Sequence, residues 1–236
     1  MIRDVKQRRS YNATLRHEQA QMTRRRILEA ARRLIAAAGY STVTMDGIAN
    51  EAGVAYQTVY SVFGTKLLLA EAMIEAGWPH VDEALNLVEQ ARESADPRVW
   101  LRTAARITRR INEPCGDLAR FMRESGDPVL LARYRKVEDE RFSQLREVAN
   151  FLEGSGRLRS TITSSEALAV LWAMTGADWY SQLVFQRRWK AARFEEWLGD
   201  SLIDLLLEPS ISELEDAPSR GPIASASKPD GCQTDL

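Results

Sequence analysis

Cysteine and histidine are scarce in this chain. Its 236 residues include two cysteines, Cys115 and Cys232, and two histidines, His17 and His80. So few cysteines exclude a small disulfide-stabilised scaffold and are typical of a reducing compartment. None of these cysteines and histidines stands at a spacing that binds a metal ion. The sequence therefore predicts neither a metal site nor a cofactor.

Long apolar runs are absent as well. No segment that could cross a membrane, about 18 apolar residues, is free of charged residues. The first residues are charged, with no apolar segment behind them, so we expect no secretory signal peptide. These patterns predict a cytoplasmic protein without a membrane partner.

Catalytic motifs are missing too. The sequence holds no nucleophile elbow and no glycine-rich phosphate loop. The carboxylates of Glu138, Asp139 and Glu140 are neighbours, but lysines and arginines surround them on a predicted helix, which is typical of a solvated face. We therefore expect that the protein is not an enzyme.

The net charge of −1 hides an uneven distribution. Residues 1–33 contain ten lysines and arginines against three acidic residues, whereas residues 208–236 contain six acidic residues against two basic ones. Both ends hold too little apolar surface to offset the entropy lost on ordering. The sequence predicts a flexible basic arm over 1–21 and a disordered acidic tail over 209–236.

Between these ends the apolar residues repeat with helical periodicity, and no alternating β-branched run predicts a strand. The sequence thus predicts an all-α fold. Helices are expected over 22–38, 44–52, 55–62 and from 65 through 74, and then near 81–94, 97–111, 115–124, 128–154, 164–188 and 192–207. Prolines 79, 97, 114 and 128 are expected to break these helices or to begin them.

Residues 44–66 hold two short predicted helices joined by a turn at Gly53, the pattern of a helix-turn-helix. On the second helix, Val59 and Phe63 are expected to face inward. Its other face carries uncharged hydrogen-bonding and aromatic side chains: Tyr56, Gln57, Thr58, Tyr60 and Ser61. Such a face suits the major groove, where Gln can hydrogen-bond to adenine and aromatic or methyl groups can contact thymine methyls.

Groups suited to phosphates surround this helix. Thr44 offers a hydroxyl at a predicted helix N-terminus, and Lys66 opens the following helix. Arg24 and Arg25 belong to a run of three arginines, which adds salt-dependent attraction to DNA together with the basic arm. The predicted DNA-binding residues are therefore Thr44, Tyr56, Gln57, Thr58, Tyr60, Lys66, Arg24 and Arg25.

The stretch from about Ile27 to Leu69 resembles the DNA-binding domain of the TetR family of bacterial regulators. The matching pieces are Ile27-Leu28-Glu29-Ala30-Ala31 with Leu34, Gly39-Tyr40-Ser41-Thr42-Val43-Thr44, Ile48-Ala49, Ala52-Gly53-Val54, Thr58-Val59-Tyr60, Phe63 and Lys66. The resemblance implies that Thr44, Tyr60 and Lys66 contact phosphates and that Tyr56, Gln57 and Thr58 face bases.

Two positions depart from the family pattern. Ala55 stands where the family often has Ser or Thr, and alanine cannot cap the recognition helix, which should cost about 1 kcal/mol. Gln57 stands where the family often has glycine, so the family's operator preferences do not transfer to this chain.

Together these observations predict an N-terminal three-helix helix-turn-helix DNA-binding domain over 22–68 and a helical ligand-sensing and dimerisation domain over 69–208. The resemblance implies pairing through the last two long helices, which carry two apolar stripes. The predicted dimer-interface residues are Leu168, Leu171, Thr175, Leu183, Trp197, Leu198, Ser201, Leu202 and Leu205. Alternatively, these stripes face the core of the chain itself.

A ligand pocket should be mostly apolar with a few polar groups. The candidates to line it are Trp100, Phe121, Met122, Tyr134, Trp172, Met174, Asp178 and Trp179. The sequence predicts a homodimeric repressor that a small-molecule effector releases from a double-stranded DNA operator, which we expect to be an inverted repeat. An activator, or a regulator that needs its ligand to bind DNA, would have the same sequence features. A helical interaction module with a basic surface is the other alternative.

Overall fold

The computed structural model describes residues 2–209 of the chain, with side chains described from Leu15 onward except at Trp78. Helices make up most of this range, and no strand occurs within it. The predicted all-α fold is therefore confirmed. None of the helices in the described range combines enough length with enough hydrophobicity to span a bilayer. The predicted acidic tail, from residue 210 onward, lies outside the described residues.

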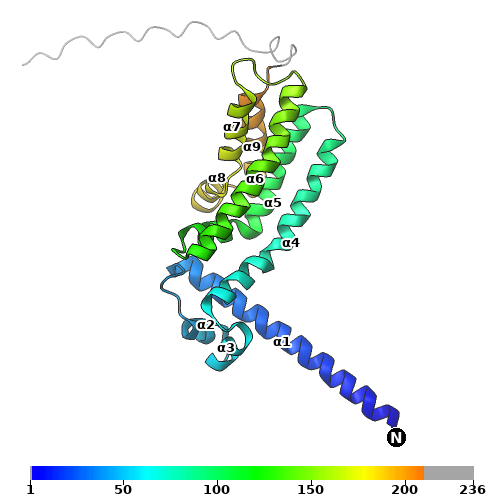
Figure 1. Cartoon of the computed structure of the whole chain (residues 1–236), viewed down its shortest axis with the longest axis vertical. Coiled ribbons are helices and arrows are strands. Elements are labelled where there is room, and N and C mark those ends of the chain that lie inside the picture. Colours follow the sequence, from blue (N-terminus) through cyan, green and yellow to red (C-terminus); the bar gives the residue numbers. More distant parts are fainter. Residues whose placement is uncertain (1, 210–236) are drawn as a thin grey trace, which may run out of the picture.

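The molecule is elongated, with a small head below a larger helical body (Figure 1). The head contains α1 (Ile2–Ala38), α2 (Met45–Ala52) and α3 (Tyr56–Phe63). The long helix α4 (Lys66–Arg92) leads from the head into the body. The body continues with α5 (Pro97–Glu124), α6 (Pro128–Gly154), α7 (Ser164–Met174), the short α8 (Ala177–Tyr180), a π-helical segment at Ser181–Gln186, and α9 (Ala191–Leu206).

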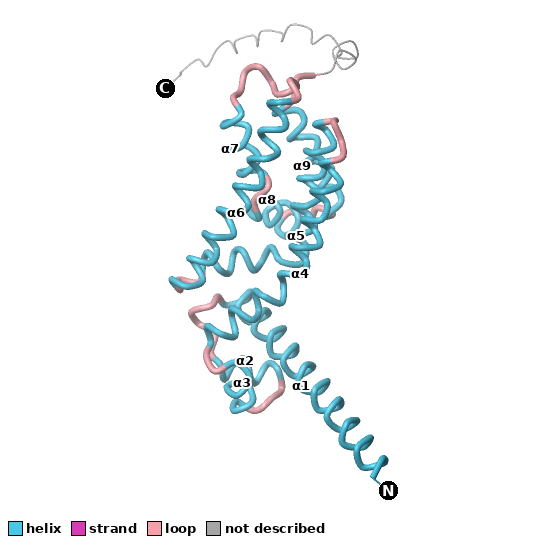
Figure 2. Tube along the Cα trace, turned by 45° about the vertical axis from the view of Figure 1, so that its right-hand side comes forward, coloured by secondary structure: helices cyan, strands magenta, loops and turns pink. Residues whose placement is uncertain are grey.

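Helix α1 is longer than the sequence predicted. Residues 2–21 were expected to form a flexible arm, but they continue the helix that holds residues 22–38 (Figure 2). This stretch contains no glycine or proline and is rich in arginine and glutamine, which favour helix. Once residues 27–35 pack on the head, each further residue extends an existing helix and avoids the cost of nucleation.

Prolines 79 and 114 were predicted to break or begin helices, but they do neither. Pro79 lies inside α4 and Pro114 lies inside α5. An internal proline costs a helix about 3 kcal/mol, and the packing of α4 along α5 offsets that cost. The prediction for Pro97 and Pro128 is confirmed, because each stands in the first turn of its helix behind an aspartate N-cap.

The predicted helix over 164–188 is interrupted. Helix α7 ends at Met174, where the Thr175 hydroxyl donates to the Leu171 carbonyl oxygen at 2.7 Å. The Arg141 guanidinium donates to the Trp172 carbonyl oxygen at 2.9 Å. Gly176 then adopts an extended backbone, and the chain re-enters a helix at α8. The Leu171 carbonyl also keeps its helical hydrogen bond from the Thr175 amide at 3.0 Å, whereas the Trp172 carbonyl accepts from Arg141.

Two clusters of buried residues hold the molecule together. The first joins α1, α2 and α3 to the start of α4 and to the C-terminal half of α5, through residues such as Ile27, Ile48, Leu69 and Phe121. The second lies in the upper body and includes Leu101, Leu152 and Phe194 among others. The head therefore does not pack only on itself: it shares a core with one end of the body.

Candidate nucleic-acid interface

Caps and a left-handed turn position the two short helices of the head. The Thr44 hydroxyl oxygen accepts a hydrogen bond from the Gly47 amide at 3.0 Å and so caps α2. Because this hydroxyl is an acceptor here, its hydrogen remains available as a donor on the exposed surface. Gly53 ends α2 with φ +63°, a conformation that favours glycine. Ala55 precedes α3 without a side-chain cap, as predicted.

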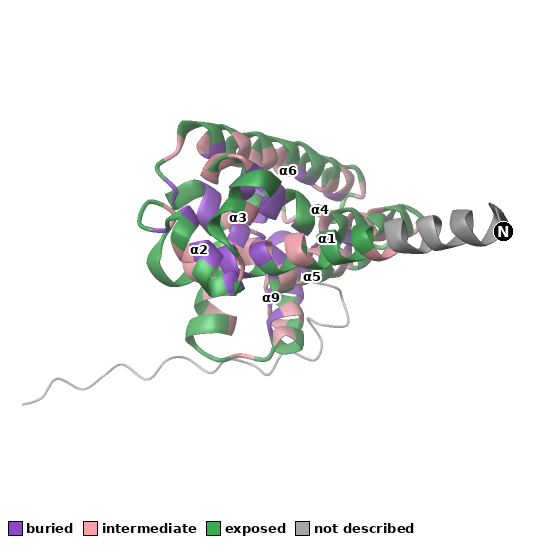
Figure 3. Ribbon diagram, turned by 90° about the horizontal axis from the view of Figure 1, so that it is seen from below, coloured by how far each residue is buried: buried purple, intermediate pink, exposed green. Residues whose placement is uncertain are grey.

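Helix α3 divides into a buried side and an exposed side. Val59 and Phe63 lie in the core of the head, as the sequence predicted. Tyr56 is 38% exposed and Tyr60 is 47% exposed, and Gln57 is exposed beside them, whereas Thr58 is half-buried. Viewed from the head end, α3 presents its exposed face outward (Figure 3). Ser61 is exposed as well, so the structure brings four of the five side chains predicted for this face to the surface. Of the three predicted to face bases, Tyr56 and Gln57 are exposed.

The two tyrosines of this face are in contact. Their ring centroids lie 4.9 Å apart with the planes inclined at 54°. The hydrogen bond between the two hydroxyls raises the pKa of Tyr56 to about 12. The Tyr56 phenol is therefore protonated near neutral pH, so it can donate or accept a hydrogen bond on a nucleic acid.

The three consecutive arginines of α1 have different surroundings. The Arg24 guanidinium lies over the Phe63 ring, 4.8 Å from its centroid, and so stands beside α3. Arg25 is exposed, and its Nε lies 3.9 Å from a Glu29 carboxylate oxygen, a long ion pair. Arg26 donates to the Ala52 carbonyl oxygen at 2.6 Å and fixes the end of α2. Sequence reasoning missed this structural role of Arg26, because a charged position on a helix gives no signal of a distant carbonyl partner.

Lys66 has a structural setting that the sequence did not predict. Its ammonium group donates to the carbonyl oxygens of Tyr40 at 2.6 Å and Val43 at 2.7 Å. It also lies 4.3 Å from the centroid of the Tyr40 ring. Burial lowers the pKa of Lys66 below its ordinary value. The ammonium thus holds the loop between α1 and α2, a different role from the phosphate contact that the sequence predicted for it.

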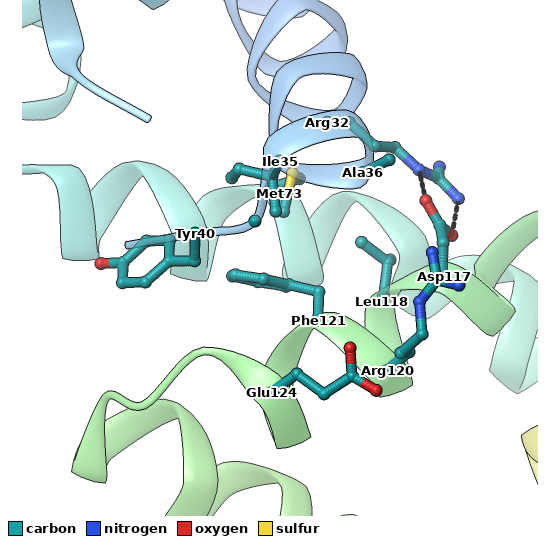
Figure 4. A pocket seen from close by; sticks show the side chains of 11 residues that line it. Arg32, Ile35, Ala36, Tyr40, Met73, Asp117, Leu118, Arg120, Phe121 and Glu124 are labelled. Atoms are coloured by element: carbon teal, nitrogen blue, oxygen red, sulfur yellow. Dashed lines mark hydrogen bonds and ion pairs between the residues drawn. The ribbon is translucent and has the colours of Figure 1, made fainter. Parts of the chain in front are cut away.

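A cavity lies where the head meets the body (Figure 4). It has a volume of about 220 Å³, and α1, α4 and α5 supply most of its walls. The Tyr40 and Phe121 rings, 5.5 Å apart, stand on one side. On the other side the Arg32 guanidinium binds the Asp117 carboxylate, with Nε–Oδ2 at 2.6 Å, and it also donates to the Pro114 carbonyl oxygen. A ligand here would touch both parts of the molecule.

The predicted pocket residues do not gather around one cavity. Of the set, only Phe121 lines the cavity at the junction. Trp100 is buried in the upper body, where its ring stacks on the Phe151 ring with the ring centroids 4.3 Å apart. Trp172 and Trp179 are each 41% exposed. The remaining members have separate positions: Met122 is buried, Tyr134 and Met174 are half-buried, and Asp178 forms an exposed ion pair with Arg123.

The predicted dimer residues divide into two groups. Five are buried within the chain's own fold: Leu168, Leu171, Thr175, Leu198 and Leu202. The alternative interpretation, that the stripes face the core of the chain itself, describes this group. The others lie at or near the surface: Leu183, Trp197 and Ser201 are half-buried, and Leu205 is 49% exposed.

Within the described part of the chain, no group of three or more His, Cys, Asp or Glu side chains is arranged to hold a metal ion. Cys115 is buried and unpaired with any cysteine that the structure describes, and burial raises the pKa of its thiol.

Comparison with known proteins agrees with the sequence resemblance. Residues 27–73 match the family model described as bacterial regulatory proteins of the tetR family. A search of curated protein sequences finds no significant match.

Solved structures share the fold over most of their length. The TetR-family transcriptional regulator PfmR from Thermus thermophilus is 22% identical, with a TM-score of 0.58 over 78% of this chain and 97% of that one. NalD, the secondary repressor of the MexAB-OprM multidrug efflux pump in Pseudomonas aeruginosa, is 19% identical, with a TM-score of 0.57 over 81% and 100%. FadR from Bacillus subtilis, solved with stearoyl-CoA, is 16% identical, with a TM-score of 0.56 over 76% and 97%.

Proposed function

We propose that this chain, which has the fold of TetR-family transcriptional regulators and matches that family over residues 27–73, is a homodimeric regulator that reads an operator through α3 and changes its DNA affinity when a small molecule binds. Its default form is a repressor that the effector releases. The comparisons support a DNA-binding regulator; the dimer, the effector and the sign of regulation are the further content of the proposal.

The observation that carries the proposal is the exposed side of α3. Tyr56, Gln57 and Tyr60 are uncharged, able to hydrogen-bond, and lie at the surface on a helix that Val59 and Phe63 anchor to the head. Base edges in the major groove are read by such side chains, whereas phosphates attract charge. A helical module that bound an acidic partner by charge alone would have no use for this uncharged face. The Thr44 hydroxyl, Arg24 and Arg25 stand around α3 as candidates for backbone contacts.

A homodimer is supported by apolar side chains that remain exposed on the C-terminal helices. Trp172, Trp179, Phe185 and Leu205 are each more than 40% exposed. They lie on α7, α8, the π-helical segment and α9, and the Trp179 ring contacts the half-buried Trp197 at 5.8 Å. Contiguous apolar patches on a monomeric soluble protein often mark an interface with another protein. A second copy of the chain would cover them and place two α3 helices for two half-sites.

The cavity at the junction of head and body is the effector site that this structure favours. Its volume of about 220 Å³ is below that of ordinary ligand pockets, so the effector would be small, and its walls come from both α1 and α5. A ligand that bound better to one arrangement of head and body would shift the population toward that arrangement. NalD is described as a repressor and FadR was solved with an acyl-CoA, which is compatible with a ligand-responsive repressor in this fold.

Selection from random duplex DNA with the purified full-length protein tests the proposal. We expect enrichment of one inverted repeat, with half-sites separated by about one helical turn or a multiple of it. The recovered repeat should bind in the presence of excess unrelated DNA. Recovery of no common sequence after several rounds, with binding that depends only on salt, would refute the proposal in favour of a charge-driven interaction module.

A further inference from the structure

The N-terminal half of α1 extends beyond the head. Among the side chains of α1 that the structure describes, from Leu15 onward, Ile27 is the first that is fully buried, and Arg24 is the first in contact with α3. From Arg16 to Met22 the side chains are exposed. Figures 1 and 2 both show α1 running past α2 and α3 and ending beyond them, at the same end of the molecule as α3. The helix therefore leaves the fold on the side where α3 presents its exposed face.

This extension is strongly basic. Residues 2–26 contain eight lysines and arginines against two acidic residues. Arg16 is exposed and forms no ion pair or hydrogen bond with any side chain that the structure describes. Arg24 follows Arg16 by eight positions, so these two positions fall on one side of the α-helix. Arg24 identifies that side as the one toward α3.

We propose that this extension binds the phosphate backbone of double-stranded DNA next to the operator. The inference rests on the proposed function, because α3 must first hold the DNA at this end of the molecule. Residues 2–23 form a helix about 33 Å long at 1.5 Å per residue, which is close to one turn of duplex DNA. One arm could therefore follow the backbone across about one additional turn and form several charge-assisted contacts.

The chemistry of the arm favours DNA over other anionic surfaces. A membrane-binding helix needs an apolar face to insert. Here the exposed stretch from Arg16 to Met22 reads RHEQAQM, with one large apolar residue. An acidic protein would satisfy the charge, but nothing at this end of the described structure shapes a protein-binding groove, whereas the DNA held by α3 would lie within reach.

The test compares operator duplexes of two lengths and one charge-matched pair of variants. The operator recovered by selection is prepared as a minimal duplex and as a duplex with about one additional turn of unrelated sequence on each side. The test variant carries Lys6→Gln, Arg8→Gln, Arg9→Gln and Arg16→Gln, which removes charge and keeps helix propensity. The control variant carries Arg135→Gln, Lys136→Gln, Arg146→Gln and Arg157→Gln, four exposed basic positions on α6 and just after it.

We expect the wild-type protein and the control variant to bind the flanked duplex about tenfold more tightly than the minimal one, and the test variant to bind both equally. For the flanked duplex, the slope of log K against log salt should become shallower by about 0.9 for each phosphate that the variant no longer neutralises. Equal binding of the two duplexes by the wild-type protein would overturn the inference, as would a test variant that retains the preference for flanks. Both results leave operator recognition intact, so they differ from a failure of the proposed function.

Discussion

The Arg32 guanidinium on α1 and the Asp117 carboxylate on α5 form a two-point contact between the head and the body. Arg32 Nε lies 2.6 Å from Asp117 Oδ2, and Arg32 Nη2 donates to Oδ1 of the same carboxylate. The hydrogen bond with Asp117 raises the pKa of Arg32 above its ordinary value. The two residues lie 85 positions apart in sequence and border the cavity at the junction. Their ion pair therefore joins the head, which is proposed to bind DNA, to the region where an effector is proposed to bind.

Replacement of Asp117 by Asn should lower the free energy of unfolding by about 1 kcal/mol, because Arg32 loses its charged partner while both side chains remain partly exposed to water. Chemical denaturation measures this loss. Asp200→Asn is the matched control, since its ion pair with Arg102 is more exposed and should contribute less than about 0.5 kcal/mol. Equal losses in the two variants would contradict a special role for the contact at the junction.

Lys66→Met should lower the free energy of unfolding by about 1–2 kcal/mol, since the Tyr40 and Val43 carbonyl oxygens lose a charged donor. The salt dependence of DNA binding should stay unchanged. Lys190→Met, at an exposed position, is the control for stability. A variant of unchanged stability, with a salt slope shallower by about 0.9, would instead indicate the phosphate contact that the sequence predicted.

Leu205→Glu should convert the dimer to a monomer at micromolar concentration, because a carboxylate would then replace an apolar group in the proposed interface. Sedimentation velocity measures the change in mass. Leu205 is 49% exposed in the single chain, so the substitution leaves its own core intact. Val129→Glu, at an apolar position that is 46% exposed on α6, is the matched control and should stay dimeric. If both variants stay dimeric, the interface lies elsewhere on the chain. If the wild-type protein is itself a monomer, the proposed dimer is wrong.

Gly77→Ala should destabilise the packing of α4 on α5 by about 1–3 kcal/mol. A Cβ at this position would lie 2.8 Å from the Leu118 Cδ1 atom and 3.1 Å from the Cys115 sulfur, and both of these side chains are buried. Gly154→Ala is the control, because a Cβ there meets no atom within 4 Å. Alanine at this helical position should stabilise the protein by about 0.5–1 kcal/mol. A neutral Gly77→Ala variant would show that the crossing of these helices is loosely packed.

The sequence predicted the head more completely than the body. The inward positions Ile27, Ile48, Val59 and Phe63 each belong to a helix whose apolar residues repeat with helical periodicity, and that periodicity reports burial within a local element. Caps and glycine turns such as Thr44 and Gly53 are also local, so their roles could be predicted from neighbouring residues alone.

Contacts between distant segments could not be predicted in this way. Arg26 and Arg32 occupy charged helix positions whose partners lie 26 and 85 residues away. On α9, Leu202 and Leu205 belong to the same predicted stripe, yet Leu202 is fully buried and Leu205 is half exposed. An apolar stripe shows that something covers the helix, but whether that partner is the same chain or another one depends on the tertiary arrangement.

The central claim is that α3 reads the operator. The operator specificity of the Gln57→Ala variant tests this claim most directly. The quantity to measure is the ratio of the dissociation constants for unrelated duplex and operator at one salt concentration. We expect Gln57→Ala to lower this ratio by the equivalent of about 1–3 kcal/mol, the contribution of one base contact, while binding to unrelated DNA stays the same. The control Gln90→Ala, at an exposed position on α4 in the body, should leave the ratio unchanged. An unchanged ratio for folded Gln57→Ala, and likewise for Tyr56→Ala, would contradict the claim that α3 reads the operator.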